Sequence, residues 1–428
     1  MATHTGLHAP LLFLLENHLD YGRPHPHLVM PASRPQFLLA SCRALLRESN
    51  SQSLPLVKRY GTVSAVAPQV PGPPSAFENA LAATSPRNNW TKEEIKELYD
   101  TPLMSLAFAA ASVHRKFHNP AAIQMCTLMN IKTGGCSEDC SYCAQSSRYS
   151  TGLKASKMVN VDSVLDAARI AKDKGSTRFC MGAAWRDMRG RKNGLKNIKA
   201  MVNGVRGMGM EVCVTLGMID LEQAKELKEA GLTAYNHNVD TSRDFYPSVI
   251  STRTYDERLQ TIQNVRDAGL NVCTGGILGL GEKPSDHVGL IHTVATLPSH
   301  PESFPVNTLV PIKGTPLGDN EPSPFDATLR TIATARLVMP RTIIRLAAGR
   351  ITLSEEQQVL CFMAGANAVF TGEKMLTTAC NGWDEDRIIF NKWGLRPMES
   401  FEVEALRELV STSAPLGVQD ERQVGTTA

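Results

Sequence analysis

Three cysteines lie close together in the sequence, at spacings that suit an inorganic centre. Cys136, Cys140 and Cys143 occur within the run Cys-Ser-Glu-Asp-Cys-Ser-Tyr-Cys. A structural zinc ion or an ordinary ferredoxin cluster would normally require a fourth protein ligand, and the next 36 residues contain no cysteine. The pattern therefore predicts a reactive centre with one open coordination position. A zinc site and a chance spacing are the alternatives.

Three further cysteines, Cys180, Cys213 and Cys273, each lie in an apolar, strand-like run. A free cysteine is often only a small buried core residue, which is the alternative here. The separations of 33 and 60 residues, however, match one and two strand–helix units, and Arg345 follows after another 72. In a barrel, these four side chains can form one inward-pointing ring, whose thiolates would balance a buried arginine. We predict a second metal centre held by this ring.

The elements that must position these residues alternate between strand and helix. Apolar, β-branched runs predict eight strands, at 123–131, 178–184, 211–216, 234–238, 271–278, 303–309, 342–347 and 368–371. Helical patterns lie between them, at 161–174, 198–208, 221–230, 255–268, 286–297, 327–339 and 355–364. Residues 123–371 approach the roughly 250 residues typical of a closed (β/α)8 barrel. We therefore predict an α/β fold of the TIM-barrel type, with an open doubly wound sheet as the alternative.

Composition excludes several classes of protein. The longest apolar runs, Pro10–Leu15 and Gln36–Ala40, are far shorter than the roughly 20 residues that span a bilayer, so no membrane segment is expected. The formal charge of +3 lies in the first 75 residues, and the balanced remainder gives no reason to expect nucleic-acid binding. Ten cysteines in 428 residues are too sparse for a secreted disulfide scaffold. Four of them have no partner pattern and no predicted role: Cys42, Cys126, Cys361 and Cys380.

The N-terminal segment differs in composition from the rest of the chain. Residues 1–86 are rich in Pro, Ser and Ala, without a sustained helical pattern, and residues 71–74 resemble a linker. Residues 30–66 are cationic, amphipathic, Ser-rich and poor in acids, as in a mitochondrial transit peptide, with a disordered tail as the alternative. Met30 is a candidate for the true start.

The barrel is expected over residues 87–395. A capping box, Thr91 with Glu94, opens a helix over 92–99 that begins a helical extension before the barrel. Residues 396–428 are expected to form a polar, flexible extension.

A three-cysteine loop with an aromatic residue, placed after the first strand of an α/β barrel, resembles that of the radical S-adenosylmethionine (SAM) enzymes. The resemblance implies that Cys136, Cys140 and Cys143 hold a [4Fe-4S] cluster whose fourth iron binds SAM, and that Tyr142 occupies the aromatic position. The stretch 275–282 is similar to the glycine motif of these enzymes, whose backbone contacts adenine. Its motif positions here are Gly275, Ile277, Gly279 and Glu282.

Longer runs resemble one family within that superfamily, the biotin synthases, over roughly residues 90–395. These runs cover residues 136–149, 175–185, 235–241, 252–257, 265–273, 313–316 and 363–367. Ser137 and Ala144 stand where many bacterial members have proline, and the chain is slightly longer around 186–197; both differences resemble eukaryotic members. The resemblance implies sulfur insertion into dethiobiotin to form biotin. Cys180, Cys213, Cys273 and Arg345 would then hold a [2Fe-2S] cluster that donates the sulfur.

Three polar residues follow the fourth predicted strand, and the same resemblance implies their roles. Asn238 and Asp240 would bind the ribose of SAM, whereas Asn236 would contact the ureido group of dethiobiotin, with Asn307 as a further candidate. A neutral urea requires amide donors and acceptors, and a diol suits a carboxylate. The alternative for each residue is a loop cap. His237 is assigned to the opposite face of the strand by alternation and is expected to be structural.

Partners and competing functions follow from the same resemblance. We expect a homodimer in the mitochondrial matrix, served by a reductase or ferredoxin-type electron donor and by iron–sulfur assembly machinery. Another radical enzyme, a methylase or a lipoyl-type sulfur inserter, is one competing function, although the extra cysteine cluster of the latter is absent from the sequence. A non-catalytic iron–sulfur protein is the other, and it predicts no SAM cleavage.

Overall fold

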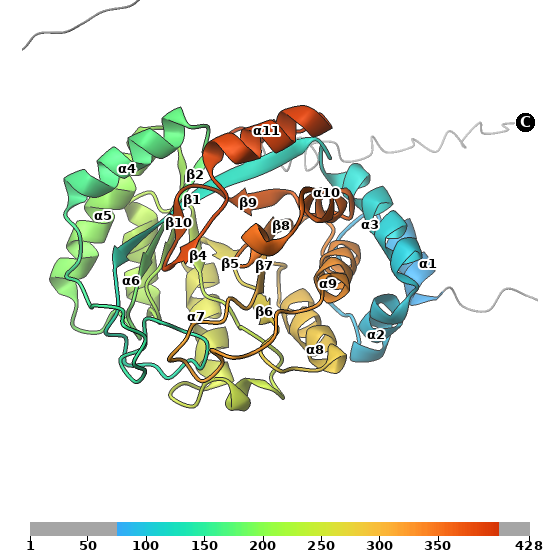
Figure 1. Ribbon diagram of the computed structural model, residues 1–428, viewed down its shortest axis with the longest axis horizontal. Coiled ribbons are helices and arrows are strands. Elements are labelled where there is room, and N and C mark those ends of the chain that lie inside the picture. The colour runs from blue at the N-terminus through green and yellow to red at the C-terminus, as the bar shows by residue number, and fades with distance from the viewer. Residues whose placement is uncertain (1–74, 402–428) are drawn as a thin grey trace, which may run out of the picture. The chain divides into compact units, whose positions relative to one another are not determined.

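Parallel strands form a closed barrel at the centre of the protein (Figure 1). The computed structural model describes residues 75–401. The strands pair in the order β1-β2-β3-β4-β5-β7-β8-β9, and β1 also pairs with β9, which closes the ring. Closure confirms the barrel and rules out the open doubly wound sheet. The bounds are β1 Ala122–Lys132, β2 Arg178–Ala183, β3 Glu211–Thr215, β4 Ala234–Asn236, β5 Asn271–Cys273, β6 Gly276–Leu278, β7 Ser303–Thr308, β8 Ile343–Leu346 and β9 Ala368–Phe370.

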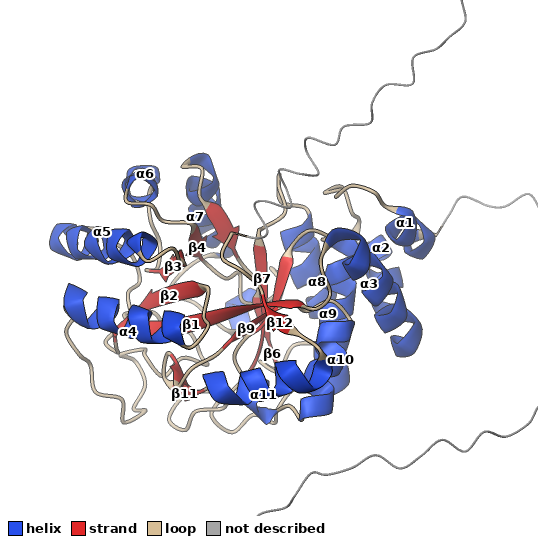
Figure 2. Cartoon of the chain, turned by 90° about the horizontal axis from the view of Figure 1, so that it is seen from above, coloured by secondary structure: helices blue, strands red, loops and turns tan. Residues whose placement is uncertain are grey.

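A helix follows each strand unit and covers the outside of the barrel (Figure 2). Their apolar faces are buried against strands that are themselves largely buried, as expected for parallel sheets. These helices are α4 Val161–Asp173, α5 Lys192–Gly207, α6 Leu221–Glu229, α7 Tyr255–Asp267, α8 Pro284–Ala295, α9 Phe325–Val338, α10 Glu355–Met363 and α11 Trp383–Trp393. None of the helices in the described part of the chain is long and apolar enough to cross a membrane.

All eight predicted strands are present, but the fifth is divided. Residues 271–278 form β5 and β6, and Gly275 between them lies against β7: a Cβ atom built on Gly275 would meet the carbonyl oxygen of Pro305 at 2.1 Å. The backbone of β7 thus approaches too closely for any side chain at this position. The division brings β6 into register with the end of β7, beside Asn307.

Three helices precede the barrel and confirm the predicted N-terminal extension (Figure 1). They are α1 Ala76–Ala82, α2 Lys92–Asp100 and α3 Leu103–Phe117; α3 packs on α9 and α2 on α8. No sustained helical pattern was predicted before residue 86, and α1 shows that this prediction is wrong for Ala76–Ala82. Ser75 and Glu78 form a capping box at the start of α1, and Ala76 and Ala80 are buried. The predicted transit peptide, Met30 and Cys42 lie outside the described residues.

The C-terminal part of the barrel domain adds elements that the hydrophobic pattern did not predict. A short hairpin, β10 Lys374–Met375 and β11 Thr378–Ala379, lies beside the cavity described below. After α11, β12 Arg396–Pro397 pairs with the start of β1, and Met398 is buried. Ordered structure therefore continues past the predicted boundary at residue 395, and residues 402–428 lie outside the described chain.

Candidate active site

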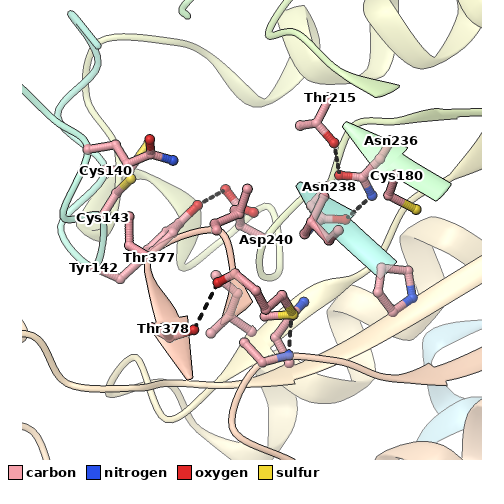
Figure 3. A pocket seen from close by; sticks show the side chains of 18 of the residues that line it. Cys140, Tyr142, Cys143, Cys180, Thr215, Asn236, Asn238, Asp240, Thr377 and Thr378 are labelled. Carbon is pink, nitrogen blue, oxygen red and sulfur yellow. Dashed lines mark hydrogen bonds between the residues drawn. The ribbon is translucent and has the colours of Figure 1, made fainter. Parts of the chain in front are cut away.

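One cavity inside the barrel contacts residues from both predicted cysteine sets. Cys140 and Cys143 line it from the loop after β1, and Cys180, Cys213 and Cys273 line it from β2, β3 and β5. In the view of Figure 3, Cys140 and Cys143 lie to one side of the cavity and Cys180 to the other, with Tyr142 and Asp240 between them. The structure thus brings the two sets to one space.

The loop after β1 presents the first set. Cys136 is half-buried and bonded through its backbone to residue 145, while Cys140 and Cys143 form a tight turn, with the Cys143 N–H donating to the Cys140 carbonyl at 3.0 Å. Burial raises the pKa of the Cys140 thiol to about 12 and that of Cys143 to about 11. Both are therefore thiols at neutral pH unless a positive metal centre favours the thiolate.

Two carboxylates anchor this loop to residues 250–254. Glu138 is buried and pairs with Arg186 at 3.1 Å and Arg253 at 3.9 Å. Asp139 accepts hydrogen bonds from the backbone N–H groups of Ser251 and Thr252, at 3.0 and 3.1 Å. Although burial opposes its charge, hydrogen bonds from the hydroxyls of Ser251 and Thr252, together with these backbone donors, lower the pKa of Asp139 to about 2. The loop is thus fixed by charged contacts before any metal binds.

The donor chemistry fits a cluster better than a single ion. Among residues 75–401, no three His, Cys, Asp or Glu side chains are placed to hold one metal ion. An iron–sulfur cluster does not require such convergence, because each thiolate binds its own iron. Three cysteines on one anchored loop, two of them facing a cavity, fit a [4Fe-4S] cluster with one iron open to that cavity.

The second set lies deeper, on the inner face of the barrel. Cys180 of β2 and Cys213 of β3 are partners in register, and Cys273 of β5 is the partner of Asn236 in β4. All three thiols are buried and share hydrogen bonds; Cys213 lies in the middle. Hydrogen bonds from Cys180 and Cys273 hold the pKa of Cys213 well below its usual range. The arrangement already favours a thiolate at this site.

Arg345 lies in the same layer but contacts a fourth cysteine. Its Nη1 contacts the thiol of Cys126 in β1, and its Nη2 donates to Gln124 at 2.8 Å and to Ser303 at 3.4 Å. Burial would raise the pKa of Cys126, but a hydrogen bond from Cys180 and the charge of Arg345 lower it to about 7. The predicted ring is therefore assembled, with one more sulfur than the sequence argument assigned.

A second arginine, which the sequence analysis missed, accompanies these thiols. Arg178 precedes Cys180 by two residues on the same face of β2, and only Glu211 pairs with it among the described carboxylates, at 3.5 Å. Within the described chain, Nε and Nη2 of Arg178 and Nε of Arg345 have no hydrogen-bond partner. Two buried cations with unused donors fit an anionic centre such as a [2Fe-2S] cluster bound to the three thiols.

Polar residues after β4 connect the two sets. Asn236 accepts from the Thr215 hydroxyl at 3.1 Å and donates to the side-chain oxygen of Asn238 at 3.1 Å and to the carbonyl of Cys273 at 3.2 Å. The Tyr142 hydroxyl donates to Asp240 at 3.0 Å (Figure 3). The Asn236 amide therefore adjoins the deeper set, and the Asp240 carboxylate adjoins the cysteine loop.

Asp240 is buried and held by charge. Arg258 Nη2 lies 2.5 Å from its carboxylate, and both side chains are almost fully enclosed. Asp240 has a left-handed backbone (φ 69°), which places its carbonyl to accept the Ile277 N–H at 2.8 Å. Burial and the Asp240 charge raise the pKa of Tyr142 well above its usual range, so its hydroxyl stays protonated.

Of the glycine motif and the remaining candidate residues, some line the cavity and others do not. Ile277 and Asn307 line the cavity, and the Asn307 amide is already bonded to backbone at 2.9 and 3.1 Å. Glu282 instead closes its own turn by accepting from the Gly279 N–H at 2.7 Å and from His287 at 2.8 Å. The lining of the cavity does not include Gly275, Gly279 or Glu282.

The assignment of His237 to the opposite face is wrong. β4 ends at Asn236, so strand alternation does not extend to the next residue, and His237 lines the cavity with its neighbours. Its Nε2 is buried without a hydrogen-bond partner among the described residues. Burial beside Arg253 and Arg258 holds the pKa of His237 well below its usual range, so the ring is neutral.

Comparison with known proteins agrees with this site. A model of the Radical SAM superfamily matches residues 130–294, and a model of the Biotin and Thiamin Synthesis associated domain matches residues 305–396. A mitochondrial biotin synthase of Emericella nidulans is 72% identical over 351 residues, covering 81% of this chain and 89% of the relative. The mitochondrial biotin synthase of Saccharomyces cerevisiae is 58% identical over 362 residues, covering 82% and 96%.

Solved structures agree with the fold. A methylornithine synthase (PylB) superposes with a TM-score of 0.64 at 17% sequence identity, covering 78% of this chain and all of that one. The Radical SAM match and the close relatives, together with the three-cysteine loop after the first strand of the barrel, define a radical SAM enzyme. Within that superfamily, the chain belongs to the biotin synthase family, as the sequence resemblance predicted.

Proposed function

We propose that the protein converts dethiobiotin into biotin by inserting sulfur drawn from its own second cluster. The observation that carries this proposal is that Cys140 and Cys143 of the first set line the same cavity as all three cysteines of the second. A radical-forming centre at one end and a sulfur donor at the other would face a substrate held between them. Membership of the biotin synthase family supports the same reaction.

Cys136, Cys140 and Cys143 would hold the first, [4Fe-4S] cluster. When bound with SAM and reduced by one electron, this group supplies a radical that can remove hydrogen from an unactivated carbon. Tyr142 orients Asp240 toward the cysteine loop, and we infer that Asp240 and Asn238 bind the ribose of SAM. The backbone of Ile277, in β6, would contact the adenine of SAM.

Cys180, Cys213, Cys273 and Arg345 would hold the second, [2Fe-2S] cluster. Three features support this: buried thiols in register, a Cys213 thiol that already favours its charged form, and arginine donors without partners. The group supplies the sulfur that bridges the two carbons. Because the ring is buried, the surrounding dielectric constant is low, and the charges of Arg178 and Arg345 would stabilise these thiolates more strongly than they would in water.

Asn236 would recognise the ureido group of dethiobiotin. Its side chain contacts Cys273 at the second cluster site and Asn238 at the SAM site, so a ureido ring bonded to it lies between the two. Asn307 lines the same cavity and offers a further amide. Trp185, Val310 and Ile312 give the rest of the lining an apolar character that suits a hydrocarbon chain.

We propose that residues 1–86 contain a mitochondrial leader, in line with the mitochondrial relatives. We further propose a homodimer, a ferredoxin-type or reductase electron donor, and assembly machinery that rebuilds the clusters. Sequencing the N-terminus of the mature protein tests the leader: a terminus downstream of Met1 is expected, and an intact Met1 would contradict it.

The reaction is tested without oxygen. Reconstituted, reduced protein receives SAM and dethiobiotin, and biotin and 5′-deoxyadenosine are measured together. Both products are expected. 5′-Deoxyadenosine without biotin would overturn the proposed substrate while leaving the radical chemistry, and neither product would overturn both.

A further inference from the structure

Cys126 is a buried cysteine for which the proposed mechanism has so far no use. It lies in β1 and has no exposed surface. It packs in one cluster with Cys180, Cys213 and Cys273, so four thiols meet on the inner face of neighbouring strands. This layer contains the residues that would hold the second cluster, which makes Cys126 more than an isolated core cysteine.

The guanidinium of Arg345 depends on Cys126. Arg345 is almost fully buried, and a buried arginine cannot shed its charge. Its Nη1 contacts the Cys126 thiol, whereas its Nη2 reaches only the neutral oxygens of Gln124 and Ser303. Cys126 is therefore the side chain that Nη1 of Arg345 contacts.

The same contacts set the direction of the arginine side chain. Phe370 lies under the guanidinium, with 5.1 Å between its ring centre and Arg345 Cζ, and both residues line the cavity. Cys126 does not line the cavity. Cys126 therefore contacts an arginine that lines the cavity without lining the cavity itself.

We propose that Cys126 is a positioning residue of the second cluster: by accepting a hydrogen bond from Arg345, it fixes the arginine that would bind this cluster. The inference rests on the proposed function, because it presupposes a cluster between Arg345 and the three cysteines. A sulfur acceptor at this position gives Arg345 one defined orientation, and a side chain without an acceptor would not.

Cys361 provides a matched control. It is also a fully buried cysteine, in α10, and it packs in the large apolar core. Burial alone raises its pKa to about 12, without any charged neighbour. Removing the Cys361 thiol tests the effect of losing a buried sulfur without touching the cluster layer.

The test compares Cys126→Ala, Cys126→Ser and Cys361→Ala in the full chain, reconstituted without oxygen. Iron and sulfide content, absorption and Mössbauer spectra report each cluster separately from activity. In Cys126→Ala we expect the second cluster to decay about tenfold faster than in the unchanged protein, since hydrogen bonds to charged groups contribute on the order of one such factor. The first cluster should be unchanged. A serine hydroxyl also accepts a hydrogen bond, so Cys126→Ser should restore the slower decay.

Two outcomes would overturn the inference. In the first, the second cluster of Cys126→Ala decays at the same rate as in Cys361→Ala and the unchanged protein. In the second, the cluster of Cys126→Ser decays as fast as that of Cys126→Ala, which would point to the Cys126 sulfur as an iron ligand. Cys126→Val, which fills the space but cannot accept, repeats the test if the alanine variant does not fold. An unchanged protein that holds only the first cluster would contradict the proposed function instead.

Discussion

Replacing Asp240 with Asn should reveal how much of the site depends on one buried ion pair. Arg258 and Asp240 are 5% and 2% exposed in their side chains and 2.5 Å apart, so the substitution leaves a buried cation without its anion. Breaking such a pair from one side costs about 3–5 kcal/mol. Arg258 keeps the Tyr246 hydroxyl at 2.8 Å. We therefore expect the lower end, about 3 kcal/mol of unfolding free energy.

Asparagine isolates the charge from the backbone. Asp240 has a φ of 69°, a conformation that Asn adopts almost as readily as Asp but that most side chains avoid. The amide also keeps an oxygen that can accept from Tyr142. An alanine at this position would add backbone strain and confuse the two effects.

The assay is urea unfolding of the full chain followed by circular dichroism. A double-mutant cycle with Arg258→Met should show coupling of about 1–3 kcal/mol, because methionine removes the unpaired cation. Glu222→Gln is the control: it breaks an exposed pair with Lys225 and should cost less than about 0.5 kcal/mol. Additive effects of Asp240→Asn and Arg258→Met, or a loss no larger than the control, would refute the reasoning.

Three further predictions concern the clusters and their support. Cys180→Ala should abolish biotin formation and the second cluster's spectrum while SAM cleavage persists; loss of both clusters, with Cys361→Ala intact, would mean one shared site. Asp139→Asn should speed loss of the first cluster in air. In the unchanged protein, the hydrogen bonds that Asp139 accepts should weaken only as the pH falls from about 4 toward 2, because the pKa of this carboxylate is lower in the folded than in the unfolded chain. Gly275→Ala, whose Cβ would meet a backbone oxygen at 2.1 Å, should lower the unfolding free energy by about 1–3 kcal/mol, whereas Gly207→Ala, with open space, should not.

Hydrophobic periodicity and cysteine spacing predicted most of this architecture. The strands are short, mostly buried runs, and helices such as α6 and α7 begin at capping boxes, so local signals and fold agree. The three-cysteine loop could be predicted because its members are neighbours in sequence. The ring of Cys180, Cys213 and Cys273 could be predicted because barrel repeats have a nearly constant length.

The contacts that the sequence did not predict are those decided by tertiary packing. Cys126 has the sequence surroundings of any core cysteine, and only closure of the barrel, where β1 pairs with β9, brings Arg345 of β8 into contact with it. His237 was misplaced because β4 ends at Asn236, two residues before the end of the predicted strand 234–238. Glu282 belongs to a matching motif, yet its carboxylate closes a local turn. A motif match indicates a loop and leaves the direction of each side chain open.

The depth of the second cysteine set determines how molecules can reach it. Cys180 and Cys213 are each the third residue of their strands, whereas the cysteine loop begins only after β1 ends. At the start of the same strands, Gln124 and Glu211 are buried, and the Gln124 amide donates to the Glu211 carboxylate at 3.1 Å. We therefore propose that a second cluster held by this ring would be rebuilt through the cavity that the substrate also uses, so that rebuilding and turnover could not take place at the same time.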